Sequence, residues 1–428
     1  MKRDRQNRVL NNIVSPYGLA LASYGSFLLA CLLSPAVYSR YMGEPDLMFL
    51  DPATILFYTL CVASFVAGVW LVGLLYPSSL VELRFKTQIS SVAFLLIPLA
   101  LGITATAIST LHLIKQVPNL VVILLSQRGG SLKDTLVFDV EGDFTLIPLV
   151  LIGLIWWTFW RSSSLGLQGW RNRLVMLLLF IAVLSVIVSS TLTLSRILLM
   201  LVVCGLAILY VMRRALNKQL SIRFMLNSSL VIVIAISVLF FTFSFLRGAY
   251  DWVDQVRSLM GYTAASYNRL AAIVHGNLRY PFAGQGVYLS SVAAHSRLLL
   301  GGVINPPTNL EIWGSEFGAV SQAGLDGSLI WSGAFGYIFS ELGWFSPLFV
   351  FGCGLLCGLV WNWMKRGKVI GVVLYPFCGF CVLFWFGTNY LLDRPAEILM
   401  FLALTLSIYE LLFMKISKVS LREEAASA

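Results

Sequence analysis

Long apolar segments dominate this chain and strongly limit how it can fold. About ten of them run between Tyr17 and Met414. Ala53–Tyr76, Ser91–Ile114, Met225–Leu246 and Val369–Leu391 each supply the roughly 20 apolar residues that a helix needs to cross a hydrocarbon core of ~30 Å. Hydrophobic residues make up 58% of the sequence and charged residues only 12%. The sequence therefore predicts an all-α polytopic membrane protein.

Basic residues mark alternate connections between the apolar segments. Clusters such as Arg84/Lys86 and Arg213/Arg214 then share one side, which the positive-inside bias assigns to the cytoplasm. That side holds 19 of the 30 Lys and Arg but 5 of the 20 Asp and Glu. The pI of about 9.3 follows from these short loops, so no nucleic-acid partner is predicted. The predicted spans are 17–36, 53–76, 91–112, 144–160, 174–191, 197–212, 225–246, 344–363, 370–391 and 396–414.

Ten spans place both termini in the cytoplasm and make residues 1–428 a single membrane domain. Two extracytoplasmic loops then stand out, 113–143 and the much longer 247–343. Within the longer loop, residues 247–297 hold five Arg and two of the three histidines, with only two acids. Residues 298–343 hold four acids and no basic residue. Because Arg presents a planar fork that matches phosphate oxygens and no Lys occurs there, this loop is typical of diphosphate recognition.

Several polar residues near this face are candidates for chemistry. Arg196 lies in a tight turn between two predicted spans, where a charge is costly unless it is paired or faces a wet cavity. It is either an anion ligand or a side chain snorkelling from a helix end. A helix is expected from about Trp252 to His275, stopped by Pro281 and Gly284, and it is either a surface amphipathic helix or one that presents His275. His295 lies two residues before Arg297 and is either a base beside a bound anion or a cap on its own backbone.

Metal and disulfide chemistry have weaker support in the sequence. The seven cysteines all fall in apolar segments, where Cys behaves as a small apolar residue. The strings Glu44-Pro-Asp46 and Asp139-Val-Glu141-Gly-Asp143 could hold a divalent cation through oxygen ligands. Such strings also arise by chance in polar loops. We therefore expect no metal and no other cofactor, with a divalent cation at these carboxylates as the alternative.

The stretch Gly327–Ser346, with the apolar run that follows it, resembles part of the Wzy-like O-antigen and oligosaccharide repeat-unit polymerases. Those proteins carry a small, aromatic and Gly-rich re-entrant segment there, which leads into a long helix. The Thr-x-Ser-Arg turn ending at Arg196 is also similar to that family. So is the plan of many spans, one large late loop and two further helices. A glutamate that some members carry early in the segment has no counterpart here. Tyr337 is near its place, which leaves the role of Glu341 open.

The resemblance implies a membrane glycosyltransferase of the GT-C type. Such an enzyme would transfer a growing glycan from a polyprenyl diphosphate carrier to the non-reducing end of the next lipid-linked unit. It would act at the periplasmic face of the bacterial inner membrane, in lipopolysaccharide or exopolysaccharide synthesis. Its partners would be polyprenyl-diphosphate-linked oligosaccharides and the bilayer, with a chain-length regulator and a flippase of the same pathway.

The expected roles follow from this chemistry. Preorganised arginines stabilise the charge that develops on a leaving diphosphate, and a histidine is suited to accept the proton of the acceptor hydroxyl. Trp313, Trp331 and Tyr337 could stack on sugars or anchor the protein at the membrane interface. The predicted diphosphate ligands are Arg196, Arg269 and Arg279, with Arg128 and Arg297 in reserve. His295 is the predicted base and His275 its alternative.

Two other functions stay open at the level of sequence. An O-antigen ligase-like enzyme would share the donor and the arginines but would pass the glycan to a lipid core. A flippase or transporter of lipid-linked oligosaccharides would place polar groups near mid-membrane in broken or repeated helices. The near absence of charges within the predicted spans favours an enzyme over a transporter.

Overall fold

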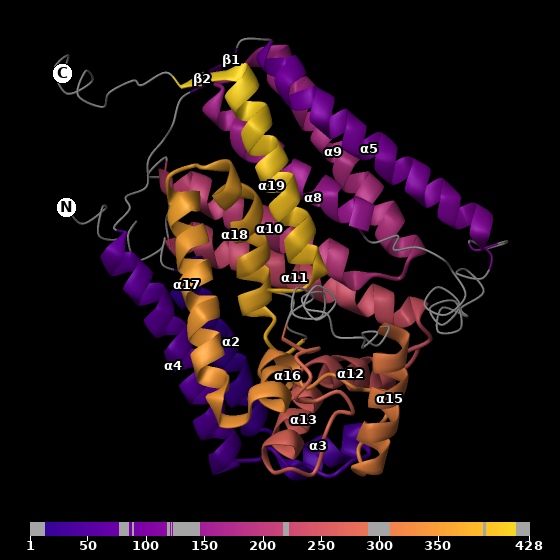
Figure 1. The fold of residues 1–428 in the computed structure, drawn as a ribbon. Coiled ribbons are helices and arrows are strands. Elements are labelled where there is room, and N and C mark those ends of the chain that lie inside the picture. Colours follow the sequence, from indigo (N-terminus) through magenta and orange to yellow (C-terminus); the bar gives the residue numbers. More distant parts are fainter. Residues whose placement is uncertain are drawn as a thin grey trace, which may run out of the picture.

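The computed structural model describes residues 13–76, 85–87, 90–117, 120, 122, 146–216, 222–289, 309–387 and 391–416. These residues are almost entirely helical, as the sequence predicts (Figure 1). The helices are α2 (Pro16–Cys31), α3 (Pro35–Met42), α4 (Pro52–Leu75), α5 (Ser91–Gln116), α8 (Leu146–Ser164), α9 (Gly169–Leu192), α10 (Arg196–Leu216), α11 (Ile222–Leu246), α12 (Trp252–Tyr262), α13 (Ala264–Val274), α15 (Asn309–Gln322), α16 (Gly333–Leu342), the 3₁₀ turn η1 (Gly343–Phe345), α17 (Ser346–Lys365), α18 (Val369–Leu383) and α19 (Arg394–Phe413). Two three-residue strands, β1 (Phe85–Thr87) and β2 (Met414–Ile416), complete the fold.

Each of the ten predicted spans overlaps one of these helices. Within the described residues, seven helices are long and apolar enough to cross a membrane, and the pair α2–α3, bent by 91°, raises this to eight if it counts as one span. The 15-residue α18 is shorter than such a span. The protein is therefore a polytopic helical membrane protein. The sequence locates its helices more closely than it determines how many of them cross the bilayer.

Glycines bring α4 and α17 into direct backbone contact. A Cβ atom on Gly68 would collide with the carbonyl oxygen of Phe351, and one on Gly354 would collide with that of Phe65. Gly354 and Gly358 form a Gly-x-x-x-Gly pair on α17, the arrangement that lets membrane helices approach closely. Because lipid tails are as apolar as leucine, this close packing, rather than the hydrophobic effect, holds the two helices together.

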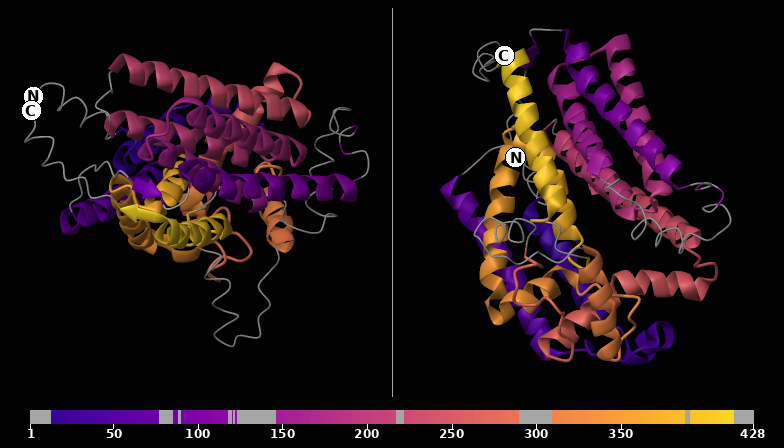
Figure 2. Two further views of the ribbon diagram at one scale, coloured as in Figure 1. Left: turned by 90° about the horizontal axis from the view of Figure 1, so that it is seen from above. Right: turned by 45° about the vertical axis from the view of Figure 1, so that its right-hand side comes forward.

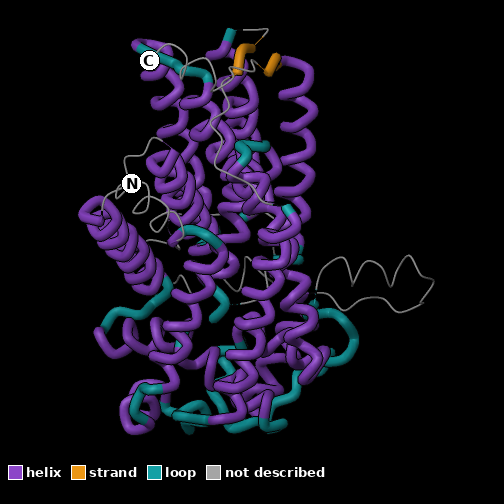
Figure 3. Tube along the Cα trace, turned by 90° about the vertical axis from the view of Figure 1, so that its left-hand side faces the viewer, coloured by secondary structure: helices purple, strands orange, loops and turns teal. Residues whose placement is uncertain are grey.

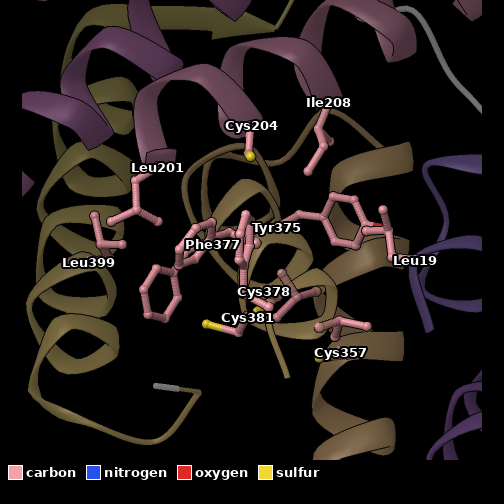
Figure 4. Packing of buried hydrophobic residues seen from close by; sticks show 14 of the residues in the cluster. Leu19, Leu201, Cys204, Ile208, Cys357, Tyr375, Phe377, Cys378, Cys381 and Leu399 are labelled. Carbon is pink, nitrogen blue, oxygen red and sulfur yellow. The ribbon is translucent and has the colours of Figure 1, made fainter. Parts of the chain in front are cut away.

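α18 is the centre of the helix bundle. Most of its side chains are buried, and Tyr375, Phe377 and Cys378 pack among residues of α2, α10, α17 and α19 (Figure 4). α4 and α17 lie on one side of α18 and α19, and α5, α8 and α9 lie on the other (Figure 2). All seven cysteines are free and buried, which confirms their predicted role as apolar packing residues.

Five short helices, α3, α12, α13, α15 and α16, gather at one end of the bundle and form what we call the helical lobe (Figure 1). Most of the loops lie at this end as well (Figure 3). α13 contacts α2, α4, α12 and α16, so the lobe is joined to the bundle through its central helix. Residues 37–52 and 247–343, which the sequence assigns to one side of the membrane, therefore lie together as far as the structure describes them.

The opposite end of the bundle is closed by β1 and β2, which pair antiparallel with Lys86 opposite Lys415. This pairing places two of the predicted cytoplasmic segments side by side. Near this end, the buried Arg161 of α8 forms an ion pair with Glu410 of α19 at 2.5 Å, and Trp157 donates to the same carboxylate at 2.7 Å. Arg161 therefore joins two helices in the interior, although the predicted span 144–160 leaves it in the connection that follows.

The predicted helix from Trp252 to His275 is present but divided. It breaks at Thr263, whose φ of −119° and ψ of −84° are not helical, into α12 and α13. The ten residues of α13 from Ala264 to Ile273 are all buried. α13 is thus an interior helix and the predicted surface amphipathic alternative is wrong for it, because its polar residues are bound by other parts of the lobe.

Candidate functional site

Two arginines converge where the lobe meets the bundle. Arg196 begins α10, and Arg247 follows the end of α11. The guanidinium carbon of Arg196 lies 4.6 Å from the ring centroid of Phe240 and 5.1 Å from that of Tyr262. Arg247 donates one hydrogen bond to the Tyr262 hydroxyl at 3.0 Å and another to the backbone carbonyl of Leu194. Both arginines therefore meet at Tyr262, and we call them the arginine pair.

The turn before Arg196 has a strained backbone. Leu194 is fully buried and has a φ of +49°, a conformation that leucine adopts at an energetic cost. Residues 193–195 are held by backbone hydrogen bonds to Ser189, Thr191 and Ser190. The carbonyl of Leu194 points to Arg247 as a result. This turn is the Thr-x-Ser-Arg element that the sequence singles out.

The arginine pair has unused hydrogen-bond donors and no counter-ion in the described part of the chain. The Nε and Nη1 atoms of Arg196 and the Nε atom of Arg247 are shielded from solvent and donate to no described residue. None of the ion pairs formed among the described residues involves either arginine. Arg196 also stands at the N-terminus of α10, where the helix dipole already favours negative charge. Two cations without a carboxylate, at this end of a helix, form a site suited to an anion.

A small aromatic pocket adjoins the arginine pair. It has a volume of about 110 Å³ and is lined by Tyr262, Trp313, Phe317 and Trp331, together with Gly261 and residues 328–330. Tyr262 contacts Trp331 edge to face, with ring centroids 4.7 Å apart. Tyr262 is thus the shared wall between the arginine pair and the aromatic pocket. The chain brings together three parts here: α12, α15 and the segment before α16.

Two of the three predicted sugar-stacking residues, Trp313 and Trp331, line this pocket. The third, Tyr337, does not. It is 6% exposed and stacks on Tyr280 with centroids 5.2 Å apart, with Tyr288 5.3 Å away on another side. Tyr337 therefore belongs to the interior of the lobe, and no face of its ring is left for a sugar.

A buried glutamate lies behind the aromatic pocket. Glu316 is 1% exposed and sits on α15 between Trp313 and Phe317 in sequence, with Tyr280, Tyr288 and Tyr337 around it. Burial raises the pKa of Glu316 to about 8, although the nearby Tyr288 hydroxyl acts in the opposite direction. Glu316 forms no ion pair with any described residue. The carboxyl group is therefore mostly protonated at neutral pH.

Arg269 is bound inside the lobe instead of facing a ligand site. Its side chain is 0% exposed, and its two Nη atoms donate to the two carboxylate oxygens of Glu44 at 2.9 Å each. The remaining N–H groups donate to the backbone carbonyls of Ala265, Asp326 and Leu329. All five donors of the guanidinium group are thus used. Arg269 therefore has no N–H group left with which to bind a diphosphate, the role predicted for it from the sequence.

His275 forms a pair with Asp51, the N-terminal cap of α4. Its Nε2 lies 3.0 Å from Asp51 Oδ2, and its side chain is 43% exposed. Burial alone would raise the pKa of Asp51, but hydrogen bonds from Thr54 and His275 lower it below its usual value. From Ala264 to His275, α13 rises 1.5 Å per residue, or about 16 Å in all. His275 is therefore at the other end of α13 from Tyr262, too far to act on a group held by the arginine pair.

The other predicted site residues divide into two groups. Arg279 is exposed on the lobe, five residues after the end of α13. Arg128, His295 and Arg297 lie outside the described residues. The first predicted carboxylate motif is described: Glu44 is bound by Arg269, and Asp46 accepts from the backbone N–H groups of Met48 and Phe49. Both oxygens of Glu44 and Oδ1 of Asp46 are thus used within the protein, whereas Oδ2 of Asp46 is buried without a hydrogen-bond partner among the described residues. The second motif, 139–143, lies outside the described part.

Three site residues were not predicted from the sequence: Arg247, Tyr262 and Glu316. Arg247 was visible as a basic residue directly after a span, on the side where such residues are few. No sequence pattern marked Tyr262, because it reaches the site only when α12 folds back along α11. That fold-back places Ser258 3.0 Å from Ser244 and Tyr262 beside Phe240. Glu316 was counted among the acids of its segment, but only the packing of α15 shows that it is buried.

Comparison with known proteins adds nothing to these observations, since no protein-family model, curated protein or solved structure matches the chain.

Proposed function

We propose that the protein is a membrane glycosyltransferase that joins lipid-linked oligosaccharide repeat units. In this proposal it transfers the growing glycan from a polyprenyl diphosphate carrier to the next lipid-linked unit, at the periplasmic face of the bacterial inner membrane. One observation carries the proposal: buried arginine donors that have no carboxylate partner among the described residues lie beside an aromatic pocket, at the start of the candidate span Arg196–Ala215. An anion and a sugar joined to each other would occupy these two adjacent places.

The proposed reaction exchanges one bond at the anomeric carbon for another. The bond from that carbon to the diphosphate oxygen breaks, and a bond to the acceptor hydroxyl oxygen forms. The hydroxyl proton passes to a base, and polyprenyl diphosphate leaves with both electrons of the broken bond. Arg196 and Arg247 would stabilise the charge that develops on the leaving oxygen, since fixed donors in a dry site are effective in this role. The aromatic rings would hold the sugar next to the diphosphate.

The position of the arginine pair also suits a lipid-linked donor. Arg196 is the first residue of a candidate span, Arg196–Ala215, and Phe240 and Arg247 stand at the end of α11. The diphosphate of a polyprenyl carrier lies at the same level, between its lipid tail and its glycan. Large exposed aromatic residues flank this level, among them Phe245, Tyr250 and Trp252. Such residues are enriched where a membrane protein meets the headgroup region.

The test replaces Arg196 by alanine and compares it with Arg213→Ala. Arg213 is a matched control, because it lies on the same helix, at its other end, and also packs over an aromatic ring, that of Phe159 at 5.5 Å. We expect Arg196→Ala to abolish polymer in cells while lipid-linked single units accumulate outside the inner membrane. Arg213→Ala should keep the polymer.

Other outcomes identify the alternatives. If polymer is still made by Arg196→Ala but is no longer attached to a lipid core, the ligase function replaces the polymerase. If single units fail to reach the periplasm, the protein is a flippase. Unchanged polymer, length and attachment in Arg196→Ala would remove the arginine pair from the function altogether.

A further inference from the structure

A second, larger cavity lies at the other end of α12 from the aromatic pocket. Its volume is about 470 Å³, within the range of small-molecule sites. Its wall comes from three distant parts of the chain: the end of α3, the first turns of α12 and the loop after α15. We call it the polar cavity. The residues that matter for its chemistry are Arg40, Glu44, Asp254, Arg257 and Asp326.

Charges in the polar cavity are balanced and partly unused. Arg257 pairs with Asp326 at 2.6 Å, and Glu44 is bound by the buried Arg269 behind the wall. Arg40 and Asp254 are exposed, and neither side chain has a hydrogen-bond or ion-pair partner among the residues that the structure describes. Guanidinium groups only donate and carboxylates only accept, so the unpaired Arg40 and Asp254 offer a ligand one group of each kind. A neutral ligand with many hydroxyl groups matches this pattern, whereas a diphosphate or a cation would meet like charges.

Two segments connect the polar cavity to the aromatic pocket. α12 carries Asp254 and Arg257 at one end and Tyr262 at the other, and residues 324–331 pass from one wall to the other. Between residues 253 and 262, α12 rises about 14 Å. Gly261 packs on Leu329, so the two segments are also in contact where they reach the aromatic pocket. A chain of two or three sugars has the length to reach from one place to the other.

We propose that the polar cavity is a second carbohydrate subsite, which binds neutral, hydroxyl-rich sugars of the glycan about 14 Å along α12 from the aromatic pocket. Asp254 accepts hydrogen bonds from the sugar hydroxyls, and Arg40 and Arg257 donate to their oxygens. The identity of this glycan as the growing chain rests on the proposed function. The subsite itself rests only on the cavity and its side chains. Distal contacts of this kind would hold the glycan between successive additions and lengthen the product.

The experiment applies purified full-length protein in detergent to an array of neutral and anionic oligosaccharides. We expect neutral oligosaccharides to be retained by the wild type and by Arg196→Ala. Asp254→Asn and Arg40→Gln should each weaken retention at least tenfold, with unchanged melting temperatures. Glu311→Gln is the matched control, because Glu311 is an exposed acid of the lobe that does not line the cavity. In cells, Asp254→Asn and Arg40→Gln should shorten the polymer without abolishing it.

Failure of this inference and failure of the proposed function give different results. If neutral oligosaccharides do not bind, if only anionic ones bind, or if Asp254→Asn and Arg40→Gln bind as well as the wild type, the subsite is wrong. If Arg196→Ala still makes normal polymer while neutral oligosaccharides bind through Asp254, the subsite stands and the polymerase function fails.

Discussion

Arg196 and Arg269 show how two arginines in one protein can have opposite surroundings. Arg269 is enclosed by Glu44 and three backbone carbonyls, which use all of its donors. Arg196 rests on two aromatic rings and keeps two shielded donors without a described acceptor. A shielded donor without an acceptor is costly in a folded protein, and it calls for a ligand or a bound ion. Arg269 holds the lobe together, and Arg196 is the arginine suited to bind an anion.

Replacing Arg269 by methionine should destabilise the protein. The change leaves the carboxylate of Glu44 buried without its partner, which typically costs about 3–5 kcal/mol. Thermal unfolding in detergent would record a clear loss, and limited proteolysis would show the lobe becoming accessible. Glu44→Gln should also destabilise the protein, although a glutamate is not expected to bind phosphate. An Arg269→Met protein that melts like the wild type but has lost activity would restore Arg269 to the diphosphate site.

Replacing Glu316 by glutamine should stabilise the protein at alkaline pH. The folded state raises the pKa of Glu316 from 4.5 to about 8, so the folded protein holds this proton more tightly than the unfolded chain does. Stability then falls as the pH rises from about 4.5 to about 8, and the loss stays constant above that. Glutamine removes this dependence, so at pH 8.5 the variant should exceed the wild type by up to about 5 kcal/mol.

Melting temperatures of the two proteins between pH 5 and pH 9 measure the effect. Glu311→Gln, an exposed substitution on the same helix, is the control and should follow the wild-type curve. If Glu316→Gln melts lower than the wild type at every pH, the glutamate is ionised and paired in the folded protein, contrary to its surroundings described above.

Among the elements, α4 and α17 depend on one another most directly. Their backbones touch at Gly68 and Gly354, and no larger residue fits at either place. α12 and α13 illustrate a different effect, since a single helical pattern in the sequence becomes two helices around Thr263. The break lets α12 fold back along α11 and present Tyr262 to the arginine pair, while α13 continues into the interior. Contacts between elements, more than local preference, determine both features.

Gly354→Ala should lower stability, whereas Gly352→Ala should not. A methyl group on Gly354 meets the backbone of Phe65, and the overpacking typically costs about 1–3 kcal/mol. The same change at Gly352, two residues away on the same helix, meets nothing within 4 Å. Thermal unfolding of the two purified variants compares them directly. Equal melting temperatures would mean that α4 and α17 separate more easily than their packing indicates.

At the scale of the whole molecule, a helix bundle carries a lobe at one end and a short strand pair at the other. The ends of α10 and α11, the turn before Arg196 and the helical lobe meet at the arginine pair. Folding is therefore what brings together Arg196, Phe240, Arg247 and Tyr262. The acidic segment that the sequence separates from the arginine-rich one folds back against it. There, Asp326 pairs with Arg257, and Trp313 and Trp331 complete the aromatic pocket.

The two ends should face opposite sides of the membrane. Because all seven native cysteines are buried, single introduced cysteines report on accessibility with little background. We expect an impermeant maleimide to label Ser39→Cys, in α3 of the lobe, in intact cells. Gln168→Cys, in the exposed turn between α8 and α9, should react only after permeabilisation. The opposite pattern would invert the orientation that the distribution of Lys and Arg predicts.

Much of the framework could be read from the sequence, because it depends on local composition. Apolar runs long enough for a bilayer specify helices wherever they occur, and every predicted span overlaps one. Trp313 and Trp331 are predicted from the sequence as aromatic residues of the large loop that stack on sugars or anchor the protein at the interface, and Arg196 as a charge close to the hydrocarbon. Arg269, Tyr337 and His275 could not be assigned correctly. Their surroundings are supplied by Glu44, Tyr280 and Asp51, which lie 57 to 225 residues away in the sequence.

The sequence by itself determined that this is a helical membrane protein, where its helices lie and on which segments its arginines are concentrated. These properties follow from residue types and their order, since the bilayer imposes the same requirement on every apolar segment. Only the tertiary structure decided which arginine is free to bind and which is held. That distinction depends on the neighbours each guanidinium meets after folding. The chain places Glu44 against Arg269 and leaves the described surroundings of Arg196 without any carboxylate.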